Sequence, residues 1–316
     1  MSRRWPGMPA KILVPLMACG SLLTAAPRVD AEAIAAESVQ THDSTGFDVE
    51  AWRLSWLARY RDADHYIGLD LGQLEHRQPA LGIERRQRLI GVTWRDVDPD
   101  DGAGSELALR SVDDGYRKRL LFDVDHLHRL GTSTRLEFFA SRAPVDTAIG
   151  LNDDLHLTHG GVGIEQRLTS RWSAVADVAW VGYSDHGQRH ALRSGLVFDL
   201  APQSGVTLQW RGKWLRTDRF GEVGGYFAPD RYQEQMAVFG WAQRSGPWRW
   251  RLRAGLGAQR VNDESWKTAR LLDVDVRYTL AVHQQISLRY QHTDAAERLG
   301  PDTTYRTLTL RWLLTR

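Results

Sequence analysis

The sequence predicts an all-β fold, a transmembrane, antiparallel, up-and-down β-barrel of about 14–16 strands. Apolar and polar side chains alternate along many segments, which places them on opposite faces of strands. The alternating segments run to roughly nine to twelve residues, longer than the strands of soluble sandwiches and suited to crossing a bilayer. Aromatic residues, including 13 tryptophans, stand at the ends of the apolar faces, as two membrane interfaces require.

The composition excludes two other classes. A net charge of +2, 25% charged residues and a mean hydropathy of −0.43 do not suit a helical membrane protein, which needs runs of about 18 apolar residues. A barrel escapes that requirement because half of each strand faces water. The nearly balanced charge also argues against a dedicated nucleic-acid binder, so we expect no nucleic-acid partner.

The first residues have the pattern of an export signal. Three basic residues, Arg3, Arg4 and Lys11, precede an uncharged apolar stretch that is too short to span a bilayer comfortably. We therefore predict a signal peptide over residues 1–31, a flexible periplasmic leader over residues 32–46, and the barrel over residues 47–316.

One alternative for this segment concerns Cys19. The residues around it resemble a lipoprotein processing box, in which this cysteine would become an acylated N-terminus. Otherwise Cys19 is an incidental member of the apolar core of a signal peptide. It is the only cysteine in the chain, so we expect no disulfide in the mature protein.

In the N-terminal half of the predicted barrel, the apolar positions of successive runs are Trp52, Leu54, Trp56, Ala58 and Tyr60; Ile67, Leu69 and Leu71; Ile90, Val92 and Trp94; Leu107 and Leu109; Leu120, Phe122 and Val124; and Leu136 and Phe138. The cluster Asp98–Gly102 predicts a turn after the third run. The alternation is weakest between Gly102 and Gly150, so the strand number is least certain there.

In the C-terminal half, the apolar positions are Trp172, Ala174, Ala176, Val178 and Trp180; Leu192, Leu196, Phe198 and Leu200; Val206, Leu208, Trp210 and Trp214; Trp248, Trp250, Leu252, Ala254, Leu256 and Ala258; Leu272, Val274, Val276, Tyr278 and Leu280; Ile286, Leu288 and Tyr290; and Leu308, Leu310, Trp312 and Leu314. The longer connections, Glu222–Pro229 and Thr293–Asp302, are expected to face outside.

If the apolar residues face lipid, the residues between them face the lumen. The predicted pore-lining residues are Arg211, Lys213, Arg249, Arg251, Arg253, Asp273, Asp275, Arg277 and Arg289. The first run adds Arg53 and Arg59. A cationic lining would favour anionic or hydrated solutes. The alternative is a ladder of ion pairs between strands that stiffens the wall and partly fills the bore.

Three short motifs resemble the barrels of exopolysaccharide secretion porins, the outer-membrane pores for cellulose and poly-N-acetylglucosamine. Residues 226–232, YFAPDRY, are similar to a Tyr-Phe-x-Pro-x-x-Tyr motif of these barrels. Residues 183–189, YSDHGQR, resemble their Tyr-Ser-Asp-Gly-Asn-Arg hairpin, with His186 and Gly187 departing from it. Residues 246–250, GPWRW, resemble their Gly-x-Trp-x-Trp strand start. The resemblance covers roughly Gly150 to the C-terminus.

The resemblance implies the C-terminal barrel domain of such a porin, but without the tetratricopeptide array that precedes it in the family. No 34-residue helical repeat fits ahead of the first predicted strand. Polymer delivery would then need a separate periplasmic export subunit. Under this interpretation Tyr226, Phe227 and Tyr232 stack on sugar rings in the lumen. The alternative is that they belong to an interfacial aromatic belt, with Pro229 at a strand end.

These observations predict a monomeric pore in the outer membrane of a Gram-negative cell, surrounded by lipid. It would be a passive conduit for exopolysaccharide or another hydrophilic or anionic solute, with no cofactor, metal or catalytic site. One alternative is a lipid-modifying hydrolase that uses His156, His159 and Asp154, because acyl transfer needs a histidine base held by a third group. The other is a structural or surface-binding barrel with a closed lumen.

Overall fold

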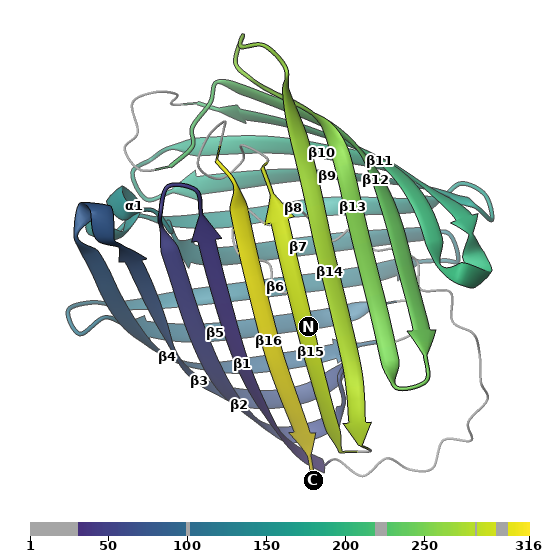
Figure 1. Ribbon diagram of the computed structural model, residues 1–316, viewed down its shortest axis with the longest axis horizontal. Coiled ribbons are helices and arrows are strands. Elements are labelled where there is room, and N and C mark those ends of the chain that lie inside the picture. Colours follow the sequence, from purple (N-terminus) through teal and green to yellow (C-terminus); the bar gives the residue numbers. More distant parts are fainter. Residues whose placement is uncertain (1–30, 99–101, 219–225, 282, 295–302) are drawn as a thin grey trace.

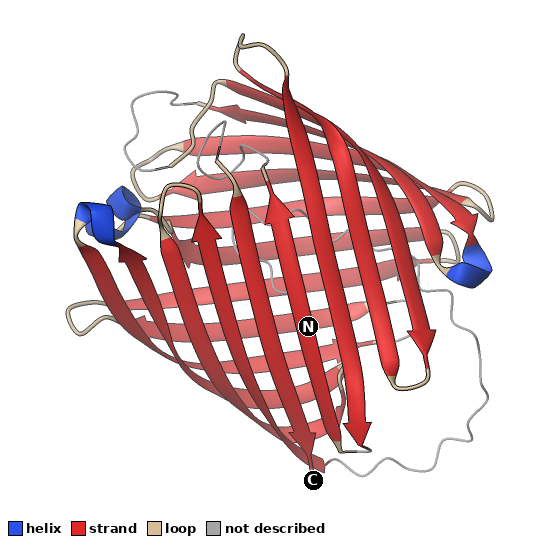
Figure 2. Cartoon of the chain, viewed as in Figure 1, coloured by secondary structure: helices blue, strands red, loops and turns tan. Residues whose placement is uncertain are grey.

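The computed structural model describes residues 31–98, 102–218, 226–281, 283–294 and 303–316. Over these ranges the chain forms sixteen strands in one closed antiparallel barrel, drawn in Figures 1 and 2. The predicted fold class is confirmed, and the strand number is the upper value of the predicted range. The predicted signal peptide and Cys19 lie outside the described residues, except for Ala31. No helix in the described part of the chain is long and apolar enough to cross a membrane.

The strands are β1 (Ala31–Asp43), β2 (Asp48–Asp62), β3 (His65–Gln78), β4 (Ile83–Val97), β5 (Gly104–Asp113), β6 (Lys118–Leu130), β7 (Thr134–Pro144), β8 (His156–Arg167), β9 (Trp172–Tyr183), β10 (Gln188–Ala201), β11 (Val206–Thr217), β12 (Arg231–Ser245), β13 (Trp248–Val261), β14 (Lys267–Ala281), β15 (Gln284–Thr293) and β16 (Tyr305–Thr315). The short helical elements are η1 (Pro79–Leu81), α1 (Ala148–Asn152) and η2 (Pro202–Ser204).

Each strand pairs with its neighbours in sequence, and the first strand closes the barrel against the last. Ala33 lies opposite Thr315, and Asp43 lies opposite Tyr305. All strands therefore have two hydrogen-bonded neighbours, so the sheet has no free edge. The strands contain from 10 residues, as in β5, to 15, as in β2, which is enough for tilted strands to cross a bilayer.

The prediction of a flexible leader over residues 32–46 is wrong. Residues 31–43 form β1, which pairs with β2 and β16 along its length. The alternation of this segment is weak because its inward positions are mostly small and its outward positions mostly polar. Glu37 is one of the buried inward residues, and its Oε2 lies 3.6 Å from Nη2 of Arg53 on β2. The pairing of Glu37 with Arg53 depends on the register between β1 and β2, which the sequence pattern does not give.

The two faces of the wall match the predicted alternation. The apolar positions are exposed on the outside, as in Trp52 at 54%, Ile90 at 59% and Leu256 at 63%. The residues between them point inward and are mostly buried. The weakly predicted runs after Gly102 are strands β5, β6 and β7, with their apolar sides outward. This continuous exposed apolar surface is what a lipid-facing wall requires.

The two ends of the barrel differ. The short-turn end carries the start of β1, the end of β16 and turns such as residues 246–247. The long-loop end carries the connections 145–155, which contains α1, and 218–230 and 294–304, where both predicted outside loops belong. Parts of the latter two connections lie outside the described residues. In Figure 1 the C-terminus and α1 lie at opposite ends of the tilted strands.

Candidate functional site

The nine predicted pore-lining residues all occupy inward positions on neighbouring strands, β11 and β13–β15. They alternate with exposed outward residues such as Trp210 and Leu288. The register places Arg253 opposite Asp273, and it places Asp275 between Arg251 and Arg289. The members on β13–β15 therefore form one charged strip of wall, whereas Arg211 and Lys213 on β11 are separated from it by β12.

Asp273 is the centre of this strip. Its side chain is 2% exposed and accepts hydrogen bonds from Nε and Nη2 of Arg289 at 3.0 and 2.8 Å. Nη2 of Arg253 and Nε2 of Gln291 also donate to it. Asp275 in turn lies 3.5 Å from Nε of Arg277. Arg253 and Arg289 thus form ion pairs between strands, as in the predicted ladder, whereas Arg277 pairs with a carboxylate of its own strand.

Arg249 and Arg251 differ from the other arginines on this wall. Both are exposed although they point inward. Neither lies within ion-pair distance of a carboxylate in the part of the chain that the structure describes. Arg249 has Arg244 opposite it on β12 and Arg277 opposite it on β14. These two arginines form an exposed cationic part of the inner wall at the short-turn end, which we call the vestibule.

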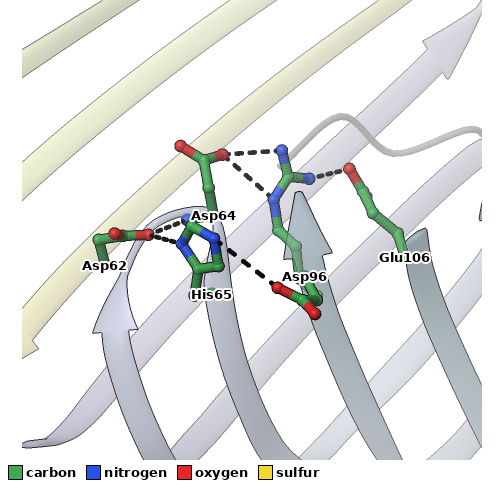
Figure 3. Close-up of polar contacts among 6 residues, drawn as sticks. Asp62, Asp64, His65, Asp96 and Glu106 are labelled. Carbon is green, nitrogen blue, oxygen red and sulfur yellow. Dashed lines mark hydrogen bonds and ion pairs between the residues drawn. The ribbon is translucent and has the colours of Figure 1, made fainter. Parts of the chain in front are cut away.

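An acidic group borders the same end on strands β2–β5. Arg95 donates to Asp64 through Nη2 at 2.9 Å, and it also forms an ion pair with Glu106. Figure 3 shows this pair beside His65, whose Nδ1 lies 2.8 Å from Asp62 and whose Nε2 lies 3.7 Å from Asp96. Asp64 also attracts Arg249 electrostatically. The short-turn end thus carries Asp64 and Glu106, both bound by the inward Arg95, whereas His65 and Asp96 occupy outward positions.

A second buried cluster of charged side chains joins strands β2, β3 and β5 on the inner face of the wall. Asp70 is fully buried and accepts a 2.6 Å hydrogen bond from Oγ of Ser55. Arg53 and Arg110 approach the same carboxylate at 3.4 and 3.5 Å. The sequence analysis missed Asp70, although its position between Leu69 and Leu71 marks it as an inward charge.

Arg59 corrects the prediction for the first run. A bulge at Ala58 shifts the register, so Arg59 lies opposite the lipid-facing Ile67. Tyr60 consequently turns inward and packs near Leu57 and Tyr66. A residue inserted into a strand moves each following side chain to the opposite face of the sheet. The alternation of the sequence does not show where such an insertion occurs.

The connection 145–155 folds into the mouth at the long-loop end. Leu151 is buried against Phe47 and the inward Val49. Its carbonyl oxygen accepts a hydrogen bond from Nη1 of the inward Arg85. Further along, Asp154 forms ion pairs with Arg117 and Arg119. This connection therefore lies against the inner wall of β2–β6 and narrows the mouth from that side.

Asp114, in the turn after β5, is a second anchor in this region. Burial acts to raise the pKa of its carboxyl group, but hydrogen bonds from the backbone N–H groups of Arg117 and Tyr116 and the positive charge of Arg119 and Arg85 outweigh it. The net pKa is lowered, so the group stays ionised and keeps the turn ordered.

Residues 226–230 narrow the mouth from the opposite side. The ring of Tyr226 stacks on the inward Tyr183, with 3.7 Å between centroids, and its hydroxyl donates to Asp185 at 3.0 Å. Burial raises the pKa of Tyr226 above its ordinary range, and the bond to Asp185 adds to the rise. Arg189 donates to the carbonyl oxygen of Phe227. The two sequence motifs that indicated the family thus contact each other.

The predicted sugar-stacking residues face the lumen side of the wall and do not form a lipid-facing belt. Tyr232 is only 1% exposed, and its hydroxyl donates to Glu234 at 2.7 Å. Phe227 packs edge-on against it. The prediction needs correction at Tyr232, whose ring has no free face for a sugar. Tyr226 and Phe227 remain half-buried at the mouth.

The histidine cluster of the hydrolase alternative is not assembled. His156 points outward and lies 2.6 Å from Nη2 of Arg142, whereas His159 points inward beside Phe139. Asp154 is held by Arg117 and Arg119, as described above. Among the described residues no group of three or more histidine, cysteine or acidic side chains could hold a metal ion.

Comparison with known proteins gives a likeness of fold. A structure described as a bacterial polysaccharide outer membrane secretin matches with a TM-score of 0.64 and 12% identity, over 90% of this chain and 98% of that chain. OccAB3 of Acinetobacter baumannii matches with a TM-score of 0.44 and 9% identity, over 91% and 99% of the two chains. OccK7 of Pseudomonas aeruginosa gives 0.44 and 11%, over 91% and 99%. No protein-family model and no curated protein sequence matches the chain.

Proposed function

We propose that this chain is an outer-membrane pore that conducts hydrophilic anionic solutes, including an exopolysaccharide with acidic groups. The observation that carries the proposal is the vestibule formed by Arg249 and Arg251. These inward arginines are exposed and have no ion-paired carboxylate among the described residues. Cations on a water-filled wall attract anions and repel other cations, which sets the selectivity of a pore.

The polymeric substrate is supported by the fold and by the sequence motifs. The secretin that matches this barrel is described as a polysaccharide protein, and residues 183–189 and 226–232 resemble motifs of such barrels. Tyr226 and Phe227 stand at the mouth, where a passing sugar ring would contact them. A periplasmic export subunit would deliver the polymer to the arginine vestibule.

Single-channel recording in planar bilayers tests conduction. The wild-type barrel is expected to show steady conductance with a reversal potential, in a salt gradient, that indicates anion preference. Arg249→Gln with Arg251→Gln should reduce this preference, because it removes two positive charges from the exposed inner wall. Arg249→Ala with Arg251→Ala should also increase the conductance, because it widens the vestibule.

The matched control is Arg86→Gln. Arg86 is exposed on the outer wall, so the change removes a positive charge without altering the lumen. Its reversal potential should equal that of the wild type. A barrel that never conducts, or a selectivity that changes equally with Arg86, contradicts the proposal. If the barrel shows no conductance but hydrolyses lipid, and if His156→Ala abolishes the hydrolysis, the hydrolase is established instead.

A closed barrel that serves as a structural or surface-binding protein is the second candidate. The two connections that narrow the long-loop end, through Leu151 and Tyr226, favour it. Detaching these two connections from the inner wall distinguishes the two functions. A pore with a narrowed mouth conducts more after release, whereas a barrel that is filled along its length stays silent.

A further inference from the structure

The outer wall at the long-loop end carries a ring of basic residues. The ring is formed by the two outward residues nearest that end on each strand. Thirteen of the sixteen strands have a basic residue at one of these positions, namely His42, Arg77, Arg86, Lys118, Arg142, His156, His190, Arg216, Arg231, Arg260, Arg270, His292 and Arg306. We call these residues the basic ring.

The opposite end of the same wall is different. Only three strands have basic residues at the corresponding outward positions, which are Arg59 and Arg61 on β2, His65 on β3 and His128 on β6. The others carry mainly apolar and aromatic residues, such as Trp172, Trp248 and Leu314. Since the apolar belt continues around the barrel between the two ends, the basic ring lies where that belt meets one membrane surface.

Several members of the ring lie within ion-pair distance of an acidic side chain, among them His42, Lys118, Arg216 and Arg231, whereas none of the members on β13–β16 does so in the described ranges. On β2–β4, Arg77 and Arg86 are bound by acidic neighbours, including Glu75, which lies 2.7 Å from Arg77 and 3.3 Å from Arg86. On β14 and β16, Arg270 and Arg306 are both exposed, and neither side chain has an ion-paired carboxylate in the described ranges.

The strand between these two arginines adds a third basic group. His292 on β15 lies directly opposite Arg306. On the other side of His292 its partner on β14 is Leu272, and Arg270 lies one outward position beyond Leu272 toward the long-loop end. One outward position further into the membrane, the same strands carry Leu272, Tyr290 and Leu308, of which Leu308 is 40% exposed. Cations thus stand directly above an apolar surface.

From this arrangement we infer that the basic ring binds phosphate-bearing lipid headgroups, with the tightest site at Arg270, His292 and Arg306. Arginine forms charge-assisted, bidentate hydrogen bonds with phosphate. Acyl chains of the same lipid would cover Leu272, Tyr290 and Leu308. The ring also fixes the orientation, since the long-loop end must face the leaflet richer in phosphorylated lipid, which in an outer membrane is the lipopolysaccharide leaflet. This inference does not depend on conduction.

The test measures lipid binding by the whole barrel in nanodiscs. Purified lipopolysaccharide is the probe, and the variant is Arg270→Gln with Arg306→Gln. Each arginine near a charged membrane surface contributes about 1 kcal/mol, so binding should weaken about fivefold for each substitution and roughly 25-fold for both. The dephosphorylated lipid should bind the wild type more weakly than the intact lipid does, because it has no phosphate for the ring to bind.

The control is Arg249→Gln with Arg251→Gln, which makes the same change of charge on the inner wall. It should bind lipopolysaccharide as the wild type does, and both double variants should keep the circular dichroism of the folded barrel. Equal weakening by the inner pair, or equal binding of dephosphorylated lipid, overturns the inference. Displacement of the lipid by millimolar inorganic phosphate would also overturn it, because it would indicate a site for free phosphate.

Discussion

Tyr226 lies face to face on Tyr183, with 5° between the ring planes, and its hydroxyl binds Asp185 two residues after its stacking partner. One side chain thus attaches the end of a long connection to the β9–β10 hairpin inside the mouth.

Tyr226 should resist ionisation. Its folded pKa is raised, so its contribution to stability is complete below the unfolded value of about 10 and is lost as the pH rises through the folded value. Ultraviolet titration of the wild type, with the spectrum of Tyr226→Phe subtracted, should show a phenol that ionises above the ordinary tyrosine range. An ordinary titration curve in this difference spectrum would contradict the stacked, hydrogen-bonded placement.

His186→Gly should stabilise the β9–β10 hairpin. His186 has a φ of 71°, in the left-handed region that glycine adopts without strain, and its side chain is exposed. Removing the strain should raise the free energy of unfolding by about 1 kcal/mol. Gly187→Ala is the contrasting variant, because its Cβ would lie 2.2 Å from the Tyr226 hydroxyl oxygen. Denaturant unfolding in micelles measures both, and equal effects would be inconsistent with this geometry.

Leu151→Ser should release the 145–155 connection from Phe47 and Val49, because it removes the buried apolar anchor. If the lumen conducts, its conductance should rise and show more frequent transitions between levels. Ile149→Ser is the matched control, since Ile149 belongs to the same connection but is 46% exposed. A larger effect from Ile149 than from Leu151 would show that the connection is anchored elsewhere.

Asp114→Asn should destabilise the barrel at neutral pH by about 1–2 kcal/mol, because charged hydrogen bonds to the Tyr116 and Arg117 backbone are weakened. The folded pKa of Asp114 is lowered. Its stabilising effect is therefore present above the unfolded value of about 3.9 and disappears as the pH falls through the folded value. Unfolding curves of wild type and variant should converge in strong acid. A difference in unfolding free energy that persists in strong acid would mean that the variant is destabilised by altered packing and not by the loss of charge.

Asp273→Asn should be the most damaging single change in the wall. It leaves Arg253 and Arg289 facing a neutral group in a site that is 2% exposed. Removing one partner of a buried ion cluster costs about 3–5 kcal/mol. The destabilisation is measured on a gel as the loss of the folded barrel after heating. Asp275→Asn should destabilise the barrel less, because the Asp275 side chain is 16% exposed.

Much of the wall could be predicted from the alternation of side chains, because one face must be apolar wherever lipid covers it. Strands β8 and β12 were not predicted, because their side chains do not alternate clearly between apolar and polar. In β12 the inward Met236 and Val238 are apolar as well and pack inside the barrel with Leu271, so the alternation disappears. In β8 the glycines around Gly161 weaken it, and the ring of Phe139 occupies the space that a Cβ there would need.

The site was predictable to a smaller extent. The inward position of Arg249 and Arg251 followed from periodicity, but their lack of ion pairs depends on the register of β12–β14. The partners of Tyr226 depend on how a long connection folds back over the mouth, which no local pattern specifies. The outward rotation of Arg59 depends on a bulge, and bulges have no strong sequence signal here.

The pairing of β1 with β16 also has a consequence for assembly. Ala33 and Thr315 come from opposite ends of the described chain, so their pairing joins distant segments, and contacts of this kind are slow to form. Until this seam closes, two strands expose backbone hydrogen-bonding groups that lipid cannot satisfy. The edges of β1 and β16 must therefore be paired or covered before they lie in the hydrocarbon region of the bilayer.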